Sequence, residues 1–124
     1  MRLVQVAQHA DDLDPAERFY AELLGTSRTA RFDPPGLLFF DMDGVRLLLD
    51  AGAPSALLYL GVPDVRGSVE ALRDRGVEIV GEPHVIFSHD DERLGPSGTD
   101  EWMAFITDSE GNTVGLVSHT PTDA

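Results

Sequence analysis

The stretch "DSEGNTVGLVSH", from Asp108 to His119, contains the turn and the strand from which the fold of this chain can be inferred. Its turn, Glu110-Gly111-Asn112, leads into a strand-like run that Gly115 interrupts. A glycine inside a strand destabilises it by about 0.5–1 kcal/mol relative to alanine, so Gly115 requires a specific reason. A turn followed by an apolar run also occurs at Asp43-Gly44, which indicates that the two parts of the chain are related.

Each half of the chain has the pattern of a strand, a helix and further strands. The first helix is predicted to follow an N-cap at Asp14 and to end at Gly25, and the second to follow Asp64 and end at Gly76. The polar segment from Ser88 to Glu101, which contains glycine and proline, predicts a loop. The remaining apolar runs predict strands: "LVQVAQH", "SRTARFD", "LLFFDM", "VRLLLD", "ALLYLGV", "VEIVGEP", "HVIFS", "WMAFITD" and "TVGLVS".

This recurring order indicates a duplicated unit, with repeats of about residues 3–51 and 55–119 inside a single domain spanning residues 1–124. Matching the two repeats on their turns places Leu48 over Gly115. The second repeat is longer because of the predicted loop. The fold class predicted from this pattern is α+β.

Composition narrows the function. The chain has 124 residues, 42% of them apolar, and no apolar run approaches the roughly 20 residues that span a bilayer. The first residues lack the features of a secretory leader, so we expect a cytoplasmic protein. Cysteine is absent, which excludes disulfides and thiolate metal sites. The net charge of −13 disfavours nucleic acid and anionic lipid as partners, and it either aids solubility alone or favours a cationic ligand.

Four stretches together resemble the vicinal oxygen chelate superfamily, which includes glyoxalase I, methylmalonyl-CoA epimerase, extradiol dioxygenases and bleomycin-resistance proteins. The resemblance implies two tandem βαβββ modules that form a curved mixed sheet around a ligand cleft, and it implies that homodimers are common. The stretches, in chain order, are "DLDPAERFYAELLG", "FFDMDGVRLLL", "PDVRGSVEALRDRGVEIVGEP" and "MAFITDSEGNTVGLV".

Enzymes of that superfamily hold a divalent metal with one residue from each of four strands, typically His, Gln or Glu. The resemblance carries these positions onto Gln5, Leu48, Leu57 and Gly115 of this chain. Leucine and glycine side chains offer no oxygen or nitrogen donor, which leaves glutamine alone. We therefore expect no metal and no other cofactor, and a divalent metal at a degenerate site is the alternative.

Other residues are candidates for contact with a ligand. His84, in "GEPHVIF", is a candidate general base or hydrogen-bonding group, although a lone histidine is more often structural. Arg46 shares strand parity with Leu48, and Trp102 either lines the cleft or belongs to the core. We expect His9, His89 and His119 to be solvated. The predicted ligand-binding set is Gln5, Arg46, Leu48, Leu57, Tyr59, His84, Trp102 and Gly115.

Three functions are compatible with these features. The favoured one is a metal-independent small-molecule binding protein of the glyoxalase/bleomycin-resistance type, sequestering a cationic antibiotic or metabolite. The second is a lyase or isomerase that uses His84, or a metal at non-standard positions such as Gln5, His84 and Glu101. The third is a dimeric interaction module with a vestigial cleft. Whether the protein catalyses a reaction is left open by the sequence.

Overall fold

The computed structural model describes residues 1–122, which form two compact units. Unit 1 comprises residues 1–56 and 108–112, and unit 2 comprises residues 57–107 and those from 113 onward. Both units have the order strand, helix, three strands. Unit 1 contains β1 (Gln5–His9), α1 (Leu13–Leu24), β2 (Ala30–Phe32), β3 (Leu37–Met42) and β4 (Val45–Asp50). Unit 2 contains β5 (Leu58–Gly61), α2 (Val65–Asp74), β6 (Ile79–His89), β7 (Thr99–Thr107) and β8 (Thr113–Pro121).

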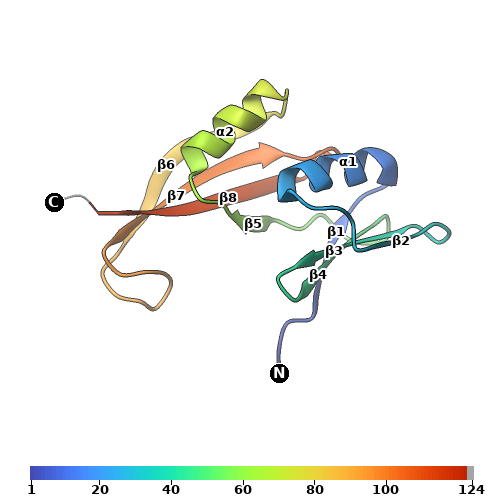
Figure 1. The fold of residues 1–124 in the computed structure, drawn as a ribbon, viewed down its shortest axis with the longest axis horizontal. Coiled ribbons are helices and arrows are strands. Elements are labelled where there is room, and N and C mark those ends of the chain that lie inside the picture. Colours follow the sequence, from blue (N-terminus) through green and yellow to red (C-terminus); the bar gives the residue numbers. More distant parts are fainter. Residues whose placement is uncertain (123–124) are drawn as a thin grey trace. The chain divides into compact units, whose positions relative to one another are not determined.

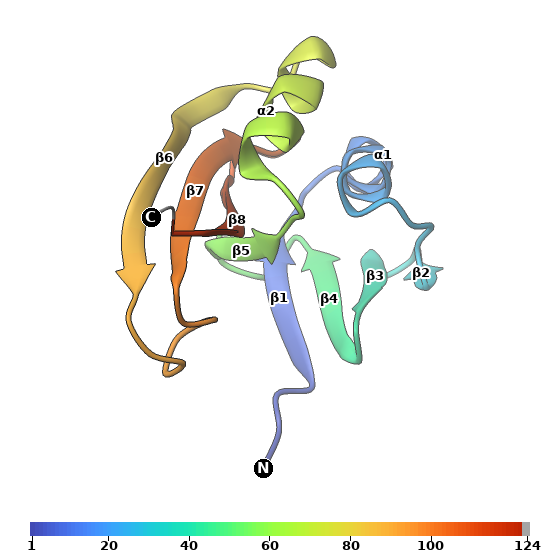
Figure 2. The same ribbon diagram turned by 60° about the vertical axis from the view of Figure 1, so that its left-hand side comes forward.

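The two sheets share one topology. Their strand orders are β1-β4-β3-β2 and β5-β8-β7-β6, each with a parallel pair of its first and last strands (Figure 2). In unit 1 Ala7 lies opposite Leu48, and in unit 2 Tyr59 lies opposite Gly115. Leu48 and Gly115 therefore occupy the same place in their sheets. The predicted α+β class of two tandem βαβββ modules is confirmed.

The core of unit 1 lies on one face of its sheet, under α1. Alternate residues of β3 and β4 are buried there, because successive side chains of a strand point to opposite faces. The buried set comprises Leu38, Phe40, Leu47 and Leu49 from the sheet, with Ala16 and Tyr20 from α1. The other face, here called the distal face of unit 1, carries Gln5, Ala7, Phe39, Asp41, Arg46 and Leu48.

The core of unit 2 is built in the same way, with α2 lying along one face of its sheet (Figure 1). Asp64 caps this helix as predicted, because its carboxylate accepts a hydrogen bond from the backbone N–H of Arg66 at 3.2 Å. The buried apolar set comprises Val65, Val69 and Leu72 of α2 with Ala104, Ile106, Val114 and Leu116 of the sheet. The opposite face, the distal face of unit 2, carries Tyr59, Met103, Phe105, Gly115 and Val117.

The predicted N-cap of α1 is wrong. The helix begins earlier than expected, with Asp12 rather than Asp14 at the N-cap position, and the Asp12 side chain makes no capping hydrogen bond. The carboxylate of Glu110 satisfies this end instead, accepting the backbone N–H groups of Asp11 at 2.7 Å and Asp12 at 3.2 Å. A carboxylate at a helix N-terminus satisfies free N–H donors and complements the helix dipole.

The predicted break between "VEIVGEP" and "HVIFS" is also wrong, since both stretches belong to the single strand β6. Within residues 1–122 β6 pairs only with β7, so Pro83 lies in an edge strand, where a missing N–H is tolerated. Register shifts accommodate the irregular segment around Gly81. The predicted loop from Ser88 to Glu101 contracts to residues 90–98, because β6 and β7 extend into it from both sides.

No helix within residues 1–122 combines the length and the apolar character that crossing a membrane requires.

Candidate functional site

The distal face of unit 1 presents a polar pair beside apolar side chains. Gln5 and Arg46 are cross-strand partners, and Arg46 Nε donates a hydrogen bond to Gln5 Oε1 at 3.0 Å. Leu48 and Phe39 are partners further along the same sheet, and Leu48 is 8% exposed. The structure thus brings together three predicted ligand-binding residues, Gln5, Arg46 and Leu48. The second cross-strand partner of Arg46 is Asp41 on β3, whose carboxylate accepts the backbone N–H of Gly44 at 3.2 Å.

Gly115 has a packing reason in unit 2. A Cβ atom at this position would lie 2.7 Å from Cδ1 of Tyr59 and 3.2 Å from Cε1 of Phe105, closer than such atoms approach. The rings of Tyr59 and Phe105 meet edge to face, with centroids 6.1 Å apart. Tyr59 remains 52% exposed, so its ring covers the glycine on one side and faces outward on the other.

The four strand positions that the superfamily uses for metal do not fit a metal ion in this chain. Gln5 Oε1 already accepts the Arg46 hydrogen bond, and Leu48 and Leu57 have no donor atoms. At Gly115 the ring of Tyr59 occupies the space into which a carboxylate side chain would start. No metal chemistry is assigned to these positions.

Three other predicted ligand-binding residues have different surroundings in unit 2. Leu57 precedes β5 and is 49% exposed. His84 is exposed on edge strand β6, opposite Met103, and its Nδ1 lies 2.9 Å from the Glu82 carbonyl oxygen. Trp102 lies on the α2 face, because its partner Ser118 accepts a hydrogen bond from the first residue of α2.

The indole of Trp102 is engaged by its neighbours on that face. The guanidinium carbon of Arg66 lies 4.4 Å from the ring centroid, and Nε1 donates to Thr120 Oγ1 at 2.9 Å. A guanidinium over an indole face is a favourable cation–π contact. Trp102 and Gly115 therefore lie on opposite faces of the sheet, and the core interpretation of the tryptophan accords with this placement.

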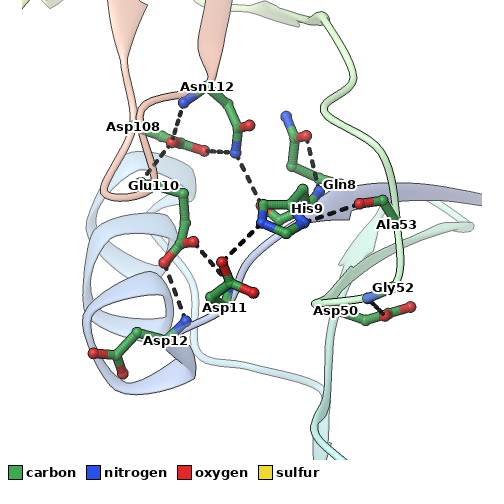
Figure 3. A network of polar contacts seen from close by, with 10 residues as sticks. All are labelled: Gln8, His9, Asp11, Asp12, Asp50, Gly52, Ala53, Asp108, Glu110 and Asn112. Atoms are coloured by element: carbon green, nitrogen blue, oxygen red, sulfur yellow. Dashed lines mark hydrogen bonds and ion pairs between the residues drawn. The ribbon is translucent and has the colours of Figure 1, made fainter.

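A polar network closes the end of β1 in unit 1 (Figure 3). His9 Nε2 lies 3.1 Å from Asp11 Oδ2, and Nδ1 lies 3.0 Å from the Ala53 carbonyl oxygen. The hydrogen bond to Asp11, followed by the one to Ala53, raises the pKa of His9 above its ordinary value. His9 was expected to be solvated, but it is only partly exposed and is held by both neighbours. With Glu110 capping α1, the network has a structural role.

The buried carboxylate of Asp108 is connected to this network through Asn112. Asp108 Oδ2 accepts the Tyr20 hydroxyl at 2.6 Å and Asn112 Nδ2 at 2.9 Å, while Oδ1 accepts the backbone N–H groups of Glu110 and Asn112. Asn112 Nδ2 also donates to the His9 carbonyl oxygen (Figure 3). Burial and then the bond to Asp108 raise the pKa of Tyr20 far above its usual range. Tyr20 therefore stays neutral.

A second cluster of His and carboxylate side chains, in unit 2, was not predicted from the sequence. His89 Nε2 lies 2.8 Å and His119 Nε2 lies 3.2 Å from the same oxygen, Oε1 of Glu101. The prediction that His89 is solvated is wrong, since this residue is 4% exposed. Glu101 and His119 are direct partners across the β7–β8 hairpin, so counting back from its turn would have paired them. No such count reaches His89, because register shifts interrupt the β6–β7 pairing.

Among the comparisons with known proteins, the one with solved structures shows the fold. No family model matches the sequence, and no curated protein matches it either. Among solved structures, a glyoxalase/bleomycin resistance protein/dioxygenase superfamily member from Sphaerobacter thermophilus is 18% identical, covering 95% of this chain and 97% of its own, with a TM-score of 0.71. A lactoylglutathione lyase from Agrobacterium tumefaciens is 23% identical, covering 94% and 92%, with a TM-score of 0.68.

A third structure, the glyoxalase/bleomycin resistance protein/dioxygenase from Alicyclobacillus acidocaldarius, is 19% identical over 95% of this chain and 91% of its own, with a TM-score of 0.66. These likenesses, over nearly the full length of each chain, define the fold. The protein has the vicinal oxygen chelate fold, as the sequence resemblance predicted.

Proposed function

We propose that the protein binds a small molecule and does so without a metal ion at the four strand positions of its fold. The main support for this proposal is at Gly115, where the ring of Tyr59 fills the space that a metal-binding carboxylate side chain would need. Folds of this kind serve small-molecule binding or catalysis, and the donors that metal-dependent chemistry would require are replaced here at Leu48, Leu57 and Gly115.

The distal faces supply the surfaces for such binding. In unit 1, the hydrogen-bonded pair Gln5 and Arg46 lies next to Leu48. In unit 2, Tyr59 and Phe105 present aromatic surface around Gly115. Small-molecule sites typically combine apolar lining with a few polar groups that fix the orientation of the ligand. The distal face of unit 1 has both polar and apolar groups, and the distal face of unit 2 contributes apolar aromatic surface.

A cation with apolar surface is the ligand class that we propose, such as a cationic antibiotic or metabolite. The net charge of −13 attracts cations over long range, and the half-exposed ring of Tyr59 can accept one on its face. On unit 1 taken by itself, the Arg46 guanidinium offers hydrogen-bond donors to a neutral or anionic ligand group. Trp102 is less suited to ligand contact than the sequence suggested, because Arg66 already covers its ring.

Thermal unfolding of the full chain in the presence of probe molecules tests the proposal. Bleomycin is the cationic probe, and an S-alkyl glutathione is the anionic probe. A ligand at 100 times its Kd stabilises the folded state by about 2.7 kcal/mol, which raises Tm by about 10 °C in a chain of this size. We expect a rise with the cationic probe that survives EDTA, weakens with added salt and falls on Tyr59→Leu.

The matched control is Phe19→Leu, which removes a partly exposed aromatic ring on α1 rather than on either distal face. It should leave the ligand-induced rise unchanged. The proposal is wrong if neither probe shifts Tm at millimolar concentration, or if EDTA abolishes the shift in both the wild type and Glu101→Gln. The Glu101→Gln variant is included because it alters the cluster of His89, Glu101 and His119. An effect of EDTA that persists in this variant therefore comes from a metal bound elsewhere, such as at the four strand positions.

A lyase or isomerase function is the second candidate, and one observation favours it. A carbonyl oxygen only accepts hydrogen bonds, so the contact with Glu82 requires His84 Nδ1 to carry the proton. The neutral ring then keeps its lone pair on Nε2, the tautomer that a general base needs. Turnover of a thioester or hemithioacetal that disappears in His84→Gln would select this function over simple binding.

We also propose that the protein forms a homodimer. The edge strand β6 carries three consecutive exposed apolar residues, Val85, Ile86 and Phe87, and an apolar edge is a typical site for association. Sedimentation analysis should give twice the mass of the chain, and Ile86→Lys should reduce it to that of one chain. The cytoplasmic location stays a prediction.

A further inference from the structure

We propose that His89, Glu101 and His119 bind a divalent transition-metal ion of the zinc type. This site lies on β6, β7 and β8 of unit 2 and uses none of the four strand positions considered above. It is independent of the proposed ligand-binding function. The donor set of two imidazoles and one carboxylate is one that proteins use for zinc and for ferrous iron.

The donor atoms converge as a metal would require. Nε2 of His89 and Nε2 of His119 lie 2.8 Å and 3.2 Å from Oε1 of Glu101, and all three atoms lie within 4.8 Å of one another. Bonds of about 2.0–2.2 Å place neighbouring ligand atoms of a tetrahedral zinc ion roughly 3.3–3.5 Å apart. Small movements of the side chains would therefore admit the ion between them.

The cluster is held rigidly and is largely shielded from solvent. Its members come from three adjacent strands, so the sheet fixes their backbone positions. The side chains of His89, Glu101 and His119 are 2%, 15% and 30% exposed. A preformed arrangement of this kind lowers the entropy lost on binding.

Gly95 of the 90–98 loop leaves space directly over the two imidazoles. A Cβ at this position would lie 2.9 Å from Cε1 of His89 and 3.1 Å from Nε2 of His119. The backbone therefore passes against the rings, and a side chain would fill the space beside the donor nitrogens. Three protein ligands leave one position of a tetrahedral ion for water or a small ligand, and a side chain at position 95 would crowd the donor nitrogens.

A second group of His and carboxylate side chains, His9, Asp11 and Glu110, differs from this cluster in the hydrogen-bond partners of its glutamate and in the charge around it. Both oxygens of Glu110 are occupied by backbone N–H groups at the start of α1. The contacts of Glu101, in contrast, are to the two imidazoles themselves. The 90–98 loop carries Asp90, Asp91 and Glu92 together with Arg93, which pairs with Asp91 at 2.9 Å, so the loop is negative on balance and favours a cation.

Calorimetric titration of the EDTA-treated full chain with ZnCl₂ tests the site. We expect one ion per chain in the wild type. Removing a ligand should cost more than the roughly 10–100-fold that the loss of an outer-shell partner costs, so Glu101→Gln and His119→Gln should each weaken binding by more than about 100-fold. Glu92→Gln in the neighbouring loop and Asp11→Asn in the other cluster are the controls, and both should stay within a few-fold of wild-type affinity.

Two further measurements make the result decisive. Circular dichroism melts of the metal-free variants verify that each one folds, and His119→Gln alters the more exposed histidine in case Glu101→Gln does not fold. Nitrogen NMR of the histidine rings should show zinc on Nε2 of His89 and His119 only. The proposal is overturned if the wild type binds no stoichiometric ion, if both ligand variants keep full affinity, or if Asp11→Asn abolishes binding.

Discussion

The replacement Gly115→Ala measures what the glycine does in unit 2. The added methyl group would lie 2.7 Å from Cδ1 of Tyr59, so either the ring or the strand must move. Because the ring is 52% exposed, it can swing toward solvent and lose its edge contact with Phe105. The cost is therefore expected at about 1–2 kcal/mol, the lower part of the range for overpacking.

The sign of the effect should reverse when the ring is absent. In a Tyr59→Ala background no clash remains, and alanine at position 115 should stabilise the strand by about 0.5–1 kcal/mol through its better backbone propensity. The four proteins form a double-mutant cycle with an expected coupling of about 2 kcal/mol. Urea unfolding followed by the fluorescence of Trp102, which lies in the same unit, measures each term.

Equal effects of Gly115→Ala in both backgrounds would refute the packing explanation of the glycine. A stabilising effect in the wild type would refute it as well, and would return position 115 to the status of an open space. Far-UV circular dichroism must give the same midpoints as fluorescence, since the free energies have meaning only for a two-state transition.

Three further outcomes follow from unit 1. Tyr20→Phe should lower the free energy of unfolding by about 1.5–3 kcal/mol in urea titrations, because the buried Asp108 carboxylate loses a hydrogen-bond donor. His9 should titrate above its ordinary pKa of 6.5 in NMR, so its contribution to stability is present below that pH and disappears as the pH rises through the folded pKa; Asp11→Asn should bring the pKa down. Gln8→Leu should lower the free energy of unfolding by about 2–4 kcal/mol in thermal melts. The buried Gln8 amide hydrogen-bonds both the backbone N–H and the carbonyl oxygen of Ala56, each at 2.7 Å.

Local signals in the sequence predicted most of the secondary structure. The turn at Asp43-Gly44 has positive φ at both residues, as a two-residue hairpin requires, and the strands on either side match the predicted runs "LLFFDM" and "VRLLLD". The match of Leu48 with Gly115 reappears as equivalent positions in two sheets. Patterns of period two and turn chemistry are local, and a single sequence displays them directly.

Contacts between distant residues were not predictable in the same way. The cap of α1 comes from Glu110, 98 residues from the amide of Asp12, so the local pattern favoured Asp14 instead. Pro83 and Gly81 resemble a strand break, and only an edge position explains why β6 continues through them. Because β6 continues, His89 lies in the sheet beside Glu101. The predicted loop from Ser88 to Glu101 gave no reason to expect this contact.

Unit 1 is discontinuous, since residues 108–112 belong to it together with residues 1–56. On a ribosome, the first repeat would therefore be synthesised long before the carboxylates that Tyr20 and α1 need. Loop-closure entropy must be overcome before these contacts form, which delays completion of unit 1 until nearly the whole chain is available. The first sequence repeat is thus not a complete unit of folding, and a fragment cut at residue 56 should lack a stable helix start.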